Sequence, residues 1–337
     1  MPHRSGPAIL HAMGSGDLQR ARAWIERATG VRVERLEALA GGAGARRYWR
    51  VHLADASTLV WMHAIPEDAR ILPPALRAET AGIPFVEMTR LLTERGVPVP
   101  ALVAVDAESR WVLLEDLGDR HLCDLGPHDL EKRLAEAIDL LVHVHATPES
   151  DSLPFRRAFD AEWVRFELAT FEAHGLPADL RGPELAEELD RLAEAIAALP
   201  RVLCLRDVQS QNLMLDPAGR LRVIDYQDAL AAPRELDLAA LLFDSYIELS
   251  DATRAALLER YARAAGPVDP GPFALLAVQR KCKDYGRYCF VVEVRGDARY
   301  APFQARARAS VLSQLGALPD AHAPLAARLR AAFGERP

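Results

Sequence analysis

Hydrophobic and polar residues alternate over short segments near the start of the chain. An amphipathic helix is predicted over residues 18–29, where apolar residues recur every three or four positions. The residues that follow alternate with a period of two, which is typical of strands with one buried face. A glycine-rich turn and a polar turn separate these runs. Three strands are therefore predicted, at residues 31–36, 48–53 and 58–62.

The segment up to residue 115 completes a small sheet. Apolar residues at helical spacing predict a helix over residues 85–96, which ends before a Val-Pro-Val-Pro sequence because proline cannot continue a helix. Two more apolar runs, 101–105 and 111–114, lie on either side of a polar turn and predict a hairpin. Residues 1–115 are therefore predicted to form an N-terminal lobe, made of an antiparallel sheet, a leading helix and one inserted helix.

The pattern becomes mainly helical beyond residue 116. Apolar residues recur at intervals of three and four in segments bounded by proline or glycine. The predicted helices cover residues 130–145, 159–174, 184–199, 236–246 and much of the chain from 254 onward. One interruption, at 202–224, contains two apolar runs around Asp216-Pro217-Ala218-Gly219-Arg220 and predicts a second hairpin. Residues 116–337 are therefore predicted to form a helical C-terminal lobe, which makes the whole chain a two-lobed α+β protein.

Composition and charge exclude several classes of protein. The chain has 337 residues, of which 50% are hydrophobic, so both lobes can bury a core. Its 41 basic and 48 acidic residues give a net charge of −7, which argues against a dedicated nucleic-acid surface. No uncharged run approaches the roughly 20 apolar residues of a membrane helix. Four cysteines without a close pair suggest neither a zinc site nor a disulfide framework. We expect a cytoplasmic monomer without nucleic-acid or membrane partners.

The polar residues around the second hairpin form the most informative pattern. Asp207 precedes it, Asn212 follows five positions later, and Asp225 comes directly after the second apolar run. Phosphoryl transfer from ATP needs a carboxylate that orients the attacking hydroxyl and accepts its proton, together with oxygen ligands for Mg²⁺. Asp207 fits the first role as the catalytic residue, and Asn212 and Asp225 fit the second as metal ligands. ATP and Mg²⁺ are the cofactors that this pattern predicts.

Each of these residues alone also has a structural explanation. Asp and Asn side chains often accept hydrogen bonds from turn backbones, so the ends of hairpins are rich in them. Three such residues at this spacing, between a glycine-turn sheet and a helix near Asp237, favour the catalytic interpretation over three separate turn caps.

Several motifs resemble a known family. They are Leu205-x-Asp207-x4-Asn212, Ile224-Asp225-Tyr226-Gln227-Asp228 and Leu236-Asp237-Leu238. Together they resemble the motifs of the aminoglycoside phosphotransferase and choline kinase superfamily, which implies a protein-kinase-like fold with the nucleotide between the lobes. The segment Arg46-Arg47-Tyr48-Trp49-Arg50 is similar to one in the anomeric N-acetylmuramate/N-acetylglucosamine kinases of bacterial cell-wall recycling. That resemblance implies ATP-dependent phosphorylation of the anomeric hydroxyl of an amino sugar, a step of peptidoglycan recycling.

Two segments differ from those sugar kinases. Leu205 and Gln209 stand where the family's catalytic loop usually has histidines. The sequence Met62-His63-Ala64-Ile65 replaces a segment that is usually Met-Asp-Ala-Pro. These differences leave the identity of the sugar open.

The nucleotide site implied by the resemblance contains no lysine. Lysine occurs only at Lys132, Lys281 and Lys283, so none lies in the N-terminal lobe. Protein kinases grip the ATP phosphates with a lysine of the third strand, and arginine is the side chain able to replace it. We predict that this residue is Arg47 or, failing that, Arg46, since both follow the glycine-rich turn.

Further residues are assigned around the nucleotide. Gly42 and Gly44 would let backbone amides approach the phosphates, although such a turn is often only a turn. The resemblance implies that the backbone of Glu115 faces the adenine, with a polar linker as the alternative. Asp237 and Asp244 are assigned to structural support, as a helix N-cap and an acid on a helix surface.

The acceptor side is expected to involve five residues. One or both of Gln227 and Asp228 are expected to point toward the acceptor, with a helix cap as the alternative for Asp228, and Arg206 is assigned to the same side. Arg280 and Lys283 share one face of a predicted helix and are expected to bind an anionic group such as a lactyl carboxylate. A solvated basic face is the alternative for this pair.

Two other functions remain open. In the first, the same reaction takes place on an aminoglycoside, a choline-like alcohol or a nucleoside instead of an amino sugar. A catalytically silent module would bind nucleotide or sugar without turnover. The presence of Asp207, Asn212 and Asp225 together argues against the silent module, which has no need of all three.

Overall fold

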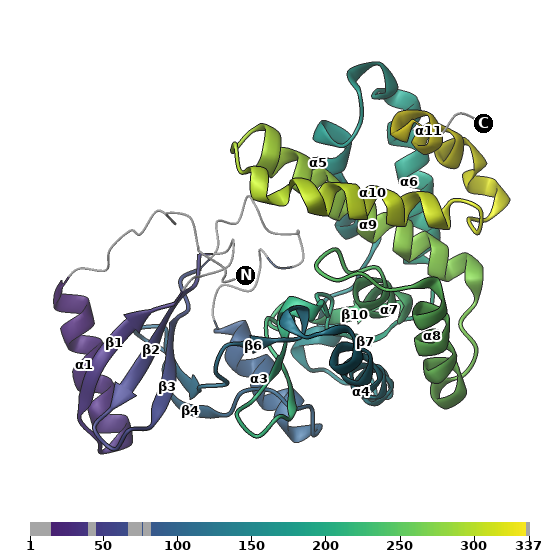
Figure 1. Ribbon diagram of the computed structural model, residues 1–337. Helices are drawn as coiled ribbons and strands as arrows, with labels where there is room; N and C mark the ends of the chain where they lie inside the picture. Colours follow the sequence, from purple (N-terminus) through teal and green to yellow (C-terminus); the bar gives the residue numbers. More distant parts are fainter. Residues whose placement is uncertain (1–14, 40–44, 67–75, 77–81, 335–337) are drawn as a thin grey trace.

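The computed structural model describes residues 15–39, 45–66, 76 and 82–334 and has two lobes (Figure 1). A sheet with a leading helix lies at one end of the molecule, and a larger body of helices lies at the other. The two-lobed α+β fold predicted from the sequence is confirmed. Among the described residues, no helix is long and apolar enough to span a membrane.

The sheet of the N-terminal lobe has five antiparallel strands in the order β1-β2-β3-β5-β4. The strands are β1 (Val33–Ala38), β2 (Arg47–Leu53), β3 (Thr58–His63), β4 (Leu102–Asp106) and β5 (Trp111–Glu115). Helix α1 (Ser15–Thr29) covers one face of this sheet, where Ala21 and Ile25 pack in a buried cluster with Trp61 and Trp111. Complete burial of a side chain such as Ile25 contributes about 1.5–3 kcal/mol, which attaches the helix firmly to the sheet.

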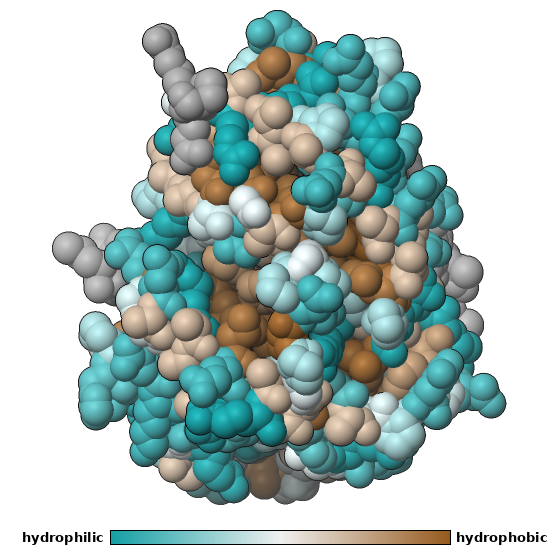
Figure 2. Space-filling model, turned by 90° about the vertical axis from the view of Figure 1, so that its right-hand side faces the viewer, coloured by the Kyte–Doolittle hydropathy of each residue, from teal (hydrophilic) through white to brown (hydrophobic). Residues whose placement is uncertain are grey.

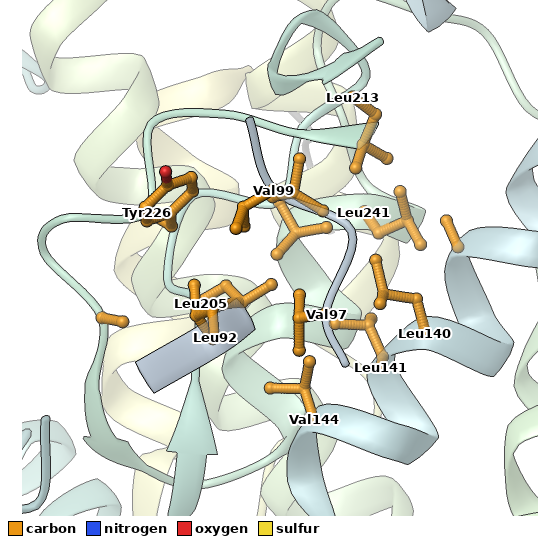
Figure 3. Packing of buried hydrophobic residues seen from close by; sticks show 14 of the residues in the cluster. Leu92, Val97, Val99, Leu140, Leu141, Val144, Leu205, Leu213, Tyr226 and Leu241 are labelled. Carbon is orange, nitrogen blue, oxygen red and sulfur yellow. The ribbon is translucent and has the colours of Figure 1, made fainter. Parts of the chain in front are cut away.

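Helix α3 (Pro84–Glu94) and the segment after it join the two lobes. The buried residues of α3 belong to the same hydrophobic core as residues of the C-terminal lobe. Figure 3 shows Leu92 and Val97 gathered with Leu141 and Leu205, which come from that lobe. An apolar core therefore continues from one lobe into the other.

Helices dominate the C-terminal lobe. They are α4 (Pro127–His145), α5 (Ala161–His174), α6 (Pro183–Ala197), α7 (Glu235–Leu242), α8 (Asp251–Ala265), α9 (Pro270–Glu293), α10 (Ala301–Gln314) and α11 (Ala323–Phe333). Side-chain caps begin three of them, Asp160 at α5, Ser250 at α8 and Asp269 at α9. Figure 2 shows polar side chains around recessed apolar ones on the outer face of this lobe.

Helices α5 and α9 approach each other very closely. A Cβ atom on Gly286 of α9 would lie 2.3 Å from the Cα atom of Phe171 and 2.5 Å from its backbone nitrogen. Only glycine, which lacks a Cβ atom, permits this approach. The contact places the preceding turns of the two helices side by side as well.

Short strands frame the loops that carry the polar motifs. The predicted hairpin is formed by β8 (Leu213–Leu215) and β9 (Leu221–Val223). In addition, β6 (Arg120–His121) pairs with β8, and β7 (Val202–Cys204) pairs with β10 (Leu230–Ala232). These extra strands are too short for an alternating pattern to reveal them. Helix α7 ends earlier than predicted because the chain turns at Asp244, whose carboxylate accepts a hydrogen bond from the nitrogen of Tyr246.

Candidate active site

Two buried carboxylates anchor the loop between β7 and β8. Asp237 accepts hydrogen bonds from the backbone nitrogens of Leu205 at 2.8 Å and Arg206 at 2.7 Å. Asp244 accepts one from the nitrogen of Ser210 at 2.6 Å. These bonds hold Arg206 at a φ of 73°, a left-handed conformation that costs free energy for a residue other than glycine. The expectation of an N-cap at Asp237 and a surface acid at Asp244 is wrong, because Asp237 lies inside α7 and both side chains are buried.

Asp207 projects from this loop among three cations. Its Oδ1 lies 2.8 Å from Nη2 of Arg280 and 3.7 Å from Nζ of Lys283. Its Oδ2 lies 3.7 Å from Nη1 of Arg206 and accepts no hydrogen bond from another described residue. Partial burial opposes ionisation, but Lys283, Arg280 and Arg206 together hold the pKa of Asp207 well below its usual range. The side chain is 20% exposed, so this ionised carboxylate is accessible to a ligand.

Glu167 of α5 completes the charged cluster and was not expected from the sequence. Its Oε1 accepts a hydrogen bond from Nη2 of Arg206 at 2.8 Å, and its Oε2 accepts one from Nε2 of Gln279 at 2.9 Å. Burial opposes ionisation of this carboxyl group, but Lys283, Arg206 and Arg280 lower its pKa to about 2. Glu167 therefore helps to hold in place the cations that surround Asp207.

Asp225 lies on the loop that follows β9. It has a φ of 62°, and its Oδ1 accepts hydrogen bonds from Nε2 of Gln227 at 3.1 Å and from Nη2 of Arg46 at 3.2 Å. Its carboxylate is 43% exposed, which leaves it open to a ligand. The strained backbone and these two contacts direct Asp225 toward Arg46, which precedes β2 of the N-terminal lobe.

The residues present fit a divalent metal ion at this position. Partial burial raises the pKa of Asp225, and the charges of Asp207 and Asp228 raise it further, against the opposing effect of Arg46. A divalent cation would relieve this repulsion among carboxylates. Asn212 donates from Nδ2 to the carbonyl oxygen of Asp207 at 2.8 Å, so its amide oxygen is left as a ligand. Carboxylate and amide oxygens are the ligands that Mg²⁺ takes in proteins.

Arg46, which precedes β2, and Arg47, which begins it, point in different directions. Arg46 crosses to the C-terminal lobe and binds Asp225, whereas Nη1 of Arg47 donates to the carbonyl oxygens of Ala45 at 2.8 Å and Arg46 at 3.1 Å. Arg46 therefore reaches the loop that carries Asp225, and the arginine that replaces the missing lysine stays a prediction. The predicted phosphate contacts of Gly42 and Gly44 lie outside the described residues.

Glu115 ends β5 at the connection between the lobes. Its backbone nitrogen donates to the carbonyl oxygen of Ala101 at 3.0 Å, and its carboxylate accepts hydrogen bonds from both terminal nitrogens of Arg222 on β9. Arg50 binds the two acids that follow, Asp116 at 2.7 Å and Asp119 at 2.9 Å. These ion pairs stabilise the connection between the lobes. The adenine contact of the Glu115 backbone stays a prediction.

The residues expected at the acceptor differ in accessibility. Asp228 is partly exposed, and its Oδ2 lies 3.5 Å from Nη1 of Arg206. Gln227 is buried and donates to the neighbouring carboxylates. Arg280 is only 2% exposed, pairs with Asp207 and donates to the carbonyl oxygen of Arg206 at 3.0 Å. This arrangement does not support a lactyl carboxylate at Arg280; the guanidinium positions Asp207 instead.

A second group of potential metal ligands lies beneath the catalytic loop. Donor atoms of His145, Cys204 and Asp237 lie within 4.8 Å of one another. Both oxygens of Asp237 already accept backbone hydrogen bonds, and Nδ1 of His145 lies 2.7 Å from the hydroxyl of Tyr261. Burial raises the pKa of Cys204 well above its usual value, which keeps it a thiol. The contacts of this buried group show that it supports the loop.

Comparison with known proteins assigns this geometry to a family. A family model described as the phosphotransferase enzyme family matches residues 35–276, which include most of the sheet and the loops that carry Asp207 and Asp225. The chain belongs to this family. The phosphotransferase is 33% identical over 278 residues to an N-acetylmuramate/N-acetylglucosamine kinase from Pseudomonas aeruginosa, with 77% of each chain covered. It is 30% identical over 286 residues to a protein of the same name from Neisseria meningitidis, with 78% of this chain and 80% of the relative covered.

Solved structures agree on the fold. Choline kinase LicA from Streptococcus pneumoniae has a TM-score of 0.63 at 17% identity and covers 89% of the phosphotransferase and 100% of its own chain. A macrolide 2′-phosphotransferase type I has a TM-score of 0.57 at 19% identity and covers 89% of this chain and 98% of its own. The predicted resemblance to the aminoglycoside phosphotransferase and choline kinase superfamily, with its protein-kinase-like fold, is confirmed.

Proposed function

We propose that this phosphotransferase transfers the γ-phosphoryl group of ATP to the anomeric hydroxyl of N-acetylmuramate or N-acetylglucosamine. The observation that carries the proposal is the identity of 33% and 30% to two kinases of that name over most of each chain. The arrangement of Asp207, Asn212 and Asp225 supplies the groups that phosphoryl transfer needs. We expect the reaction to run in the cytoplasm, on a monomeric enzyme.

The nucleotide would bind between the lobes, with Mg²⁺ held by Asp225 and the amide oxygen of Asn212. When bound, Mg²⁺ supplies positive charge that neutralises the phosphate oxygens. Arg46 would exchange its contact with Asp225 for one with the phosphates, because a planar guanidinium fork matches phosphate oxygens well. Gly42 and Gly44 would let the backbone approach the same phosphates.

Asp207 would orient the acceptor through Oδ2. The oxygen of the anomeric hydroxyl forms a bond to the γ-phosphorus, while the bond to the β,γ-bridging oxygen breaks and leaves its electron pair on ADP. The hydroxyl proton passes to Asp207 late in the step, since a carboxylate with a depressed pKa is a weak base. An anomeric hydroxyl is more acidic than an ordinary alcohol, so this weak base suffices without a histidine.

The positions of the two missing histidines are filled by buried side chains. Leu205 belongs to the hydrophobic core beneath the loop (Figure 3), and Gln209 is also buried. These replacements change how the loop packs and leave the carboxylate of Asp207 in place. The chemistry assigned to Asp207 therefore does not depend on either histidine.

A panel assay tests the proposal. ADP release would be measured with N-acetylmuramate, N-acetylglucosamine, an aminoglycoside, choline and a nucleoside, with Asp207→Asn as the control for contaminating kinases. We expect turnover of the amino sugars. Turnover of another alcohol alone would overturn the acceptor, and absence of turnover with every acceptor would support a silent binding module.

A further inference from the structure

Lys283 is a cation of the site whose hydrogen-bond donors are little used among the described residues. Its Nζ lies 3.7 Å from Oδ1 of Asp207 and 3.8 Å from Oε1 of Glu167, beyond hydrogen-bond length in both cases. Arg206 and Arg280, in contrast, donate directly to Glu167 and to a backbone carbonyl oxygen. The Lys283 side chain is 17% exposed, whereas that of Arg280 is 2% exposed. Lys283 is therefore able to turn its donors toward a bound molecule without breaking a hydrogen bond.

The ammonium group lies next to the place where the reacting atoms must be. A hydroxyl that gives its proton to Asp207 lies about 2.6–3.2 Å from that carboxylate. The phosphorus under attack lies roughly 3–3.5 Å from the oxygen of that hydroxyl, on the side away from Asp207. Nζ of Lys283 lies 3.7 Å from Oδ1 of the same carboxylate, and the flexible lysine side chain allows the ammonium group to approach the oxygens on that phosphorus. Negative charge on these oxygens is what the enzyme must stabilise during phosphoryl transfer.

The other two lysines lie elsewhere. Lys132 is exposed on α4, and Lys281 is buried, where it donates to Ser245 at 2.7 Å and to Asp284 at 2.8 Å. Lys283 is thus the one lysine of the chain placed to act at Asp207.

A different role for Lys283 would be to bind the lactyl carboxylate of N-acetylmuramate. That carboxylate is carried on a side arm of another ring carbon, away from the anomeric hydroxyl. Lys283 neighbours the carboxylate that must contact the anomeric hydroxyl itself. The geometry therefore favours the phosphoryl group over the lactyl arm as its partner.

We propose that Lys283 donates a hydrogen bond from its ammonium group to a non-bridging oxygen of the γ-phosphoryl group during transfer. The inference rests on the proposed function for the identity of the acceptor. The contact itself concerns only the transfer of the γ-phosphoryl group, whichever alcohol receives it. Lys283 stays protonated throughout: the acceptor oxygen bonds to phosphorus, the electron pair of the broken bond stays on ADP, and the hydroxyl proton goes to Asp207. Glu167 keeps the ammonium group beside Asp207 through its buried carboxylate.

Three variants test this contact through kinetics. Lys283→Met removes the charge at similar length, Lys283→Arg keeps a charge, and Lys132→Met is the matched control on an exposed helix surface. We expect Lys283→Met to lower kcat about 100-fold or more with both amino sugars alike, with little change in either KM, because a contact made in the transition state is lost. Lys283→Arg should recover part of this rate, and Lys132→Met should match the wild type.

A second measurement needs no acceptor. Calorimetry would compare the binding of ADP alone with that of ADP plus aluminium fluoride, both with Mg²⁺, since aluminium fluoride mimics the transferring phosphoryl group. We expect Lys283→Met to bind ADP normally, which also shows that it is folded, and to lose about tenfold or more of the affinity added by aluminium fluoride.

Two results would overturn the proposal. One is an unchanged gain of affinity from aluminium fluoride in Lys283→Met. The other is a defect confined to KM for N-acetylmuramate, which would assign Lys283 to the lactyl carboxylate. If the wild type turns over no amino sugar, the proposed function fails, while the aluminium fluoride comparison still decides the role of Lys283.

Discussion

Replacing Gly286 by alanine tests whether the close contact between α5 and α9 builds the active site. The new Cβ atom would lie 2.3 Å from the Cα atom of Phe171, against roughly 3.5 Å for carbon atoms in favourable contact, so the helices must part by about 1 Å. Overpacking of this kind costs about 1–3 kcal/mol, and alanine returns up to about 1 kcal/mol through its helix propensity. We expect the free energy of unfolding to fall by about 1–2 kcal/mol.

Activity should fall as well, because the charged cluster is built on the same pair of helices. Glu167 lies one turn before Phe171 on α5, and Lys283 lies one turn before Gly286 on α9. Separation of the helices would move Lys283 and Arg280 relative to Asp207. A displacement of about 1 Å costs up to roughly 100-fold in rate, so we expect kcat to fall about 10- to 100-fold. KM for ATP should change little, since the nucleotide is assigned to other elements.

Gly271→Ala, on the same helix, is the matched control. Its Cβ atom would lie 3.6 Å from Cγ of Pro319, an ordinary contact. This variant should be as stable as the wild type or slightly more stable, with full activity. Urea unfolding and steady-state kinetics of both variants make the comparison. A Gly286→Ala protein that is as stable and as active as the wild type would refute the role of this helix contact.

Other residues of the site give separate expectations. Asp207→Asn should lower kcat about a thousandfold while calorimetry shows unchanged ATP binding. Arg46→Ala should raise KM for ATP about 10- to 100-fold through loss of a charge-assisted bond of roughly 1.5–3 kcal/mol, whereas Arg47→Ala should leave it near the wild-type value. Mg²⁺ should raise nucleotide affinity in the wild type and not in Asp225→Ala; equal calorimetric affinity with and without Mg²⁺ in the wild type would contradict the metal site. The pKa of Glu167 is lowered to about 2 from 4.5, so the ionised carboxylate stabilises the fold fully above pH 4.5 and this stabilisation is lost as the pH falls toward 2. The urea unfolding midpoint of Glu167→Gln should therefore fall less steeply with pH over this range than that of the wild type.

Much of the secondary structure was predictable because many of the helices and longer strands bury one face. Strand β2, for example, was expected at 48–53 and spans Arg47–Leu53, since alternation marks the residues that face the core. The pairings of β7 with β10 and of β6 with β8 were not predictable. Segments of two or three residues carry no periodic signal, and their partners are distant in the sequence.

The same distinction applies to the site. The closeness of Asp207, Asn212 and Asp225 could be expected because one hairpin brings them together, so their spacing in the sequence reflects their spacing in space, while their roles stay predictions. Glu167 had no such signal, since its partner Gln279 lies 112 residues away on another helix. The direction of Arg46 depends on Asp225, 179 residues away, which is why the sequence did not rank it above its neighbour.

The role of Asp237 shows how a local rule misleads. Aspartate near the start of a helix is typical of an N-cap, which satisfies free amides of its own helix. In the structure its oxygens instead accept hydrogen bonds from Leu205 and Arg206, which lie on the catalytic loop. Only the packing of α7 beneath that loop makes this assignment possible.

The position of the phosphoryl group in the product tests the central claim most directly. The purified protein would be incubated with ATP, Mg²⁺ and N-acetylglucosamine or N-acetylmuramate, and the product examined by phosphorus NMR with coupling to protons retained. The account predicts a sugar phosphate whose phosphorus couples to the single anomeric proton. Coupling to the methylene protons of the exocyclic carbon, or a spectrum with no sugar phosphate, would contradict it.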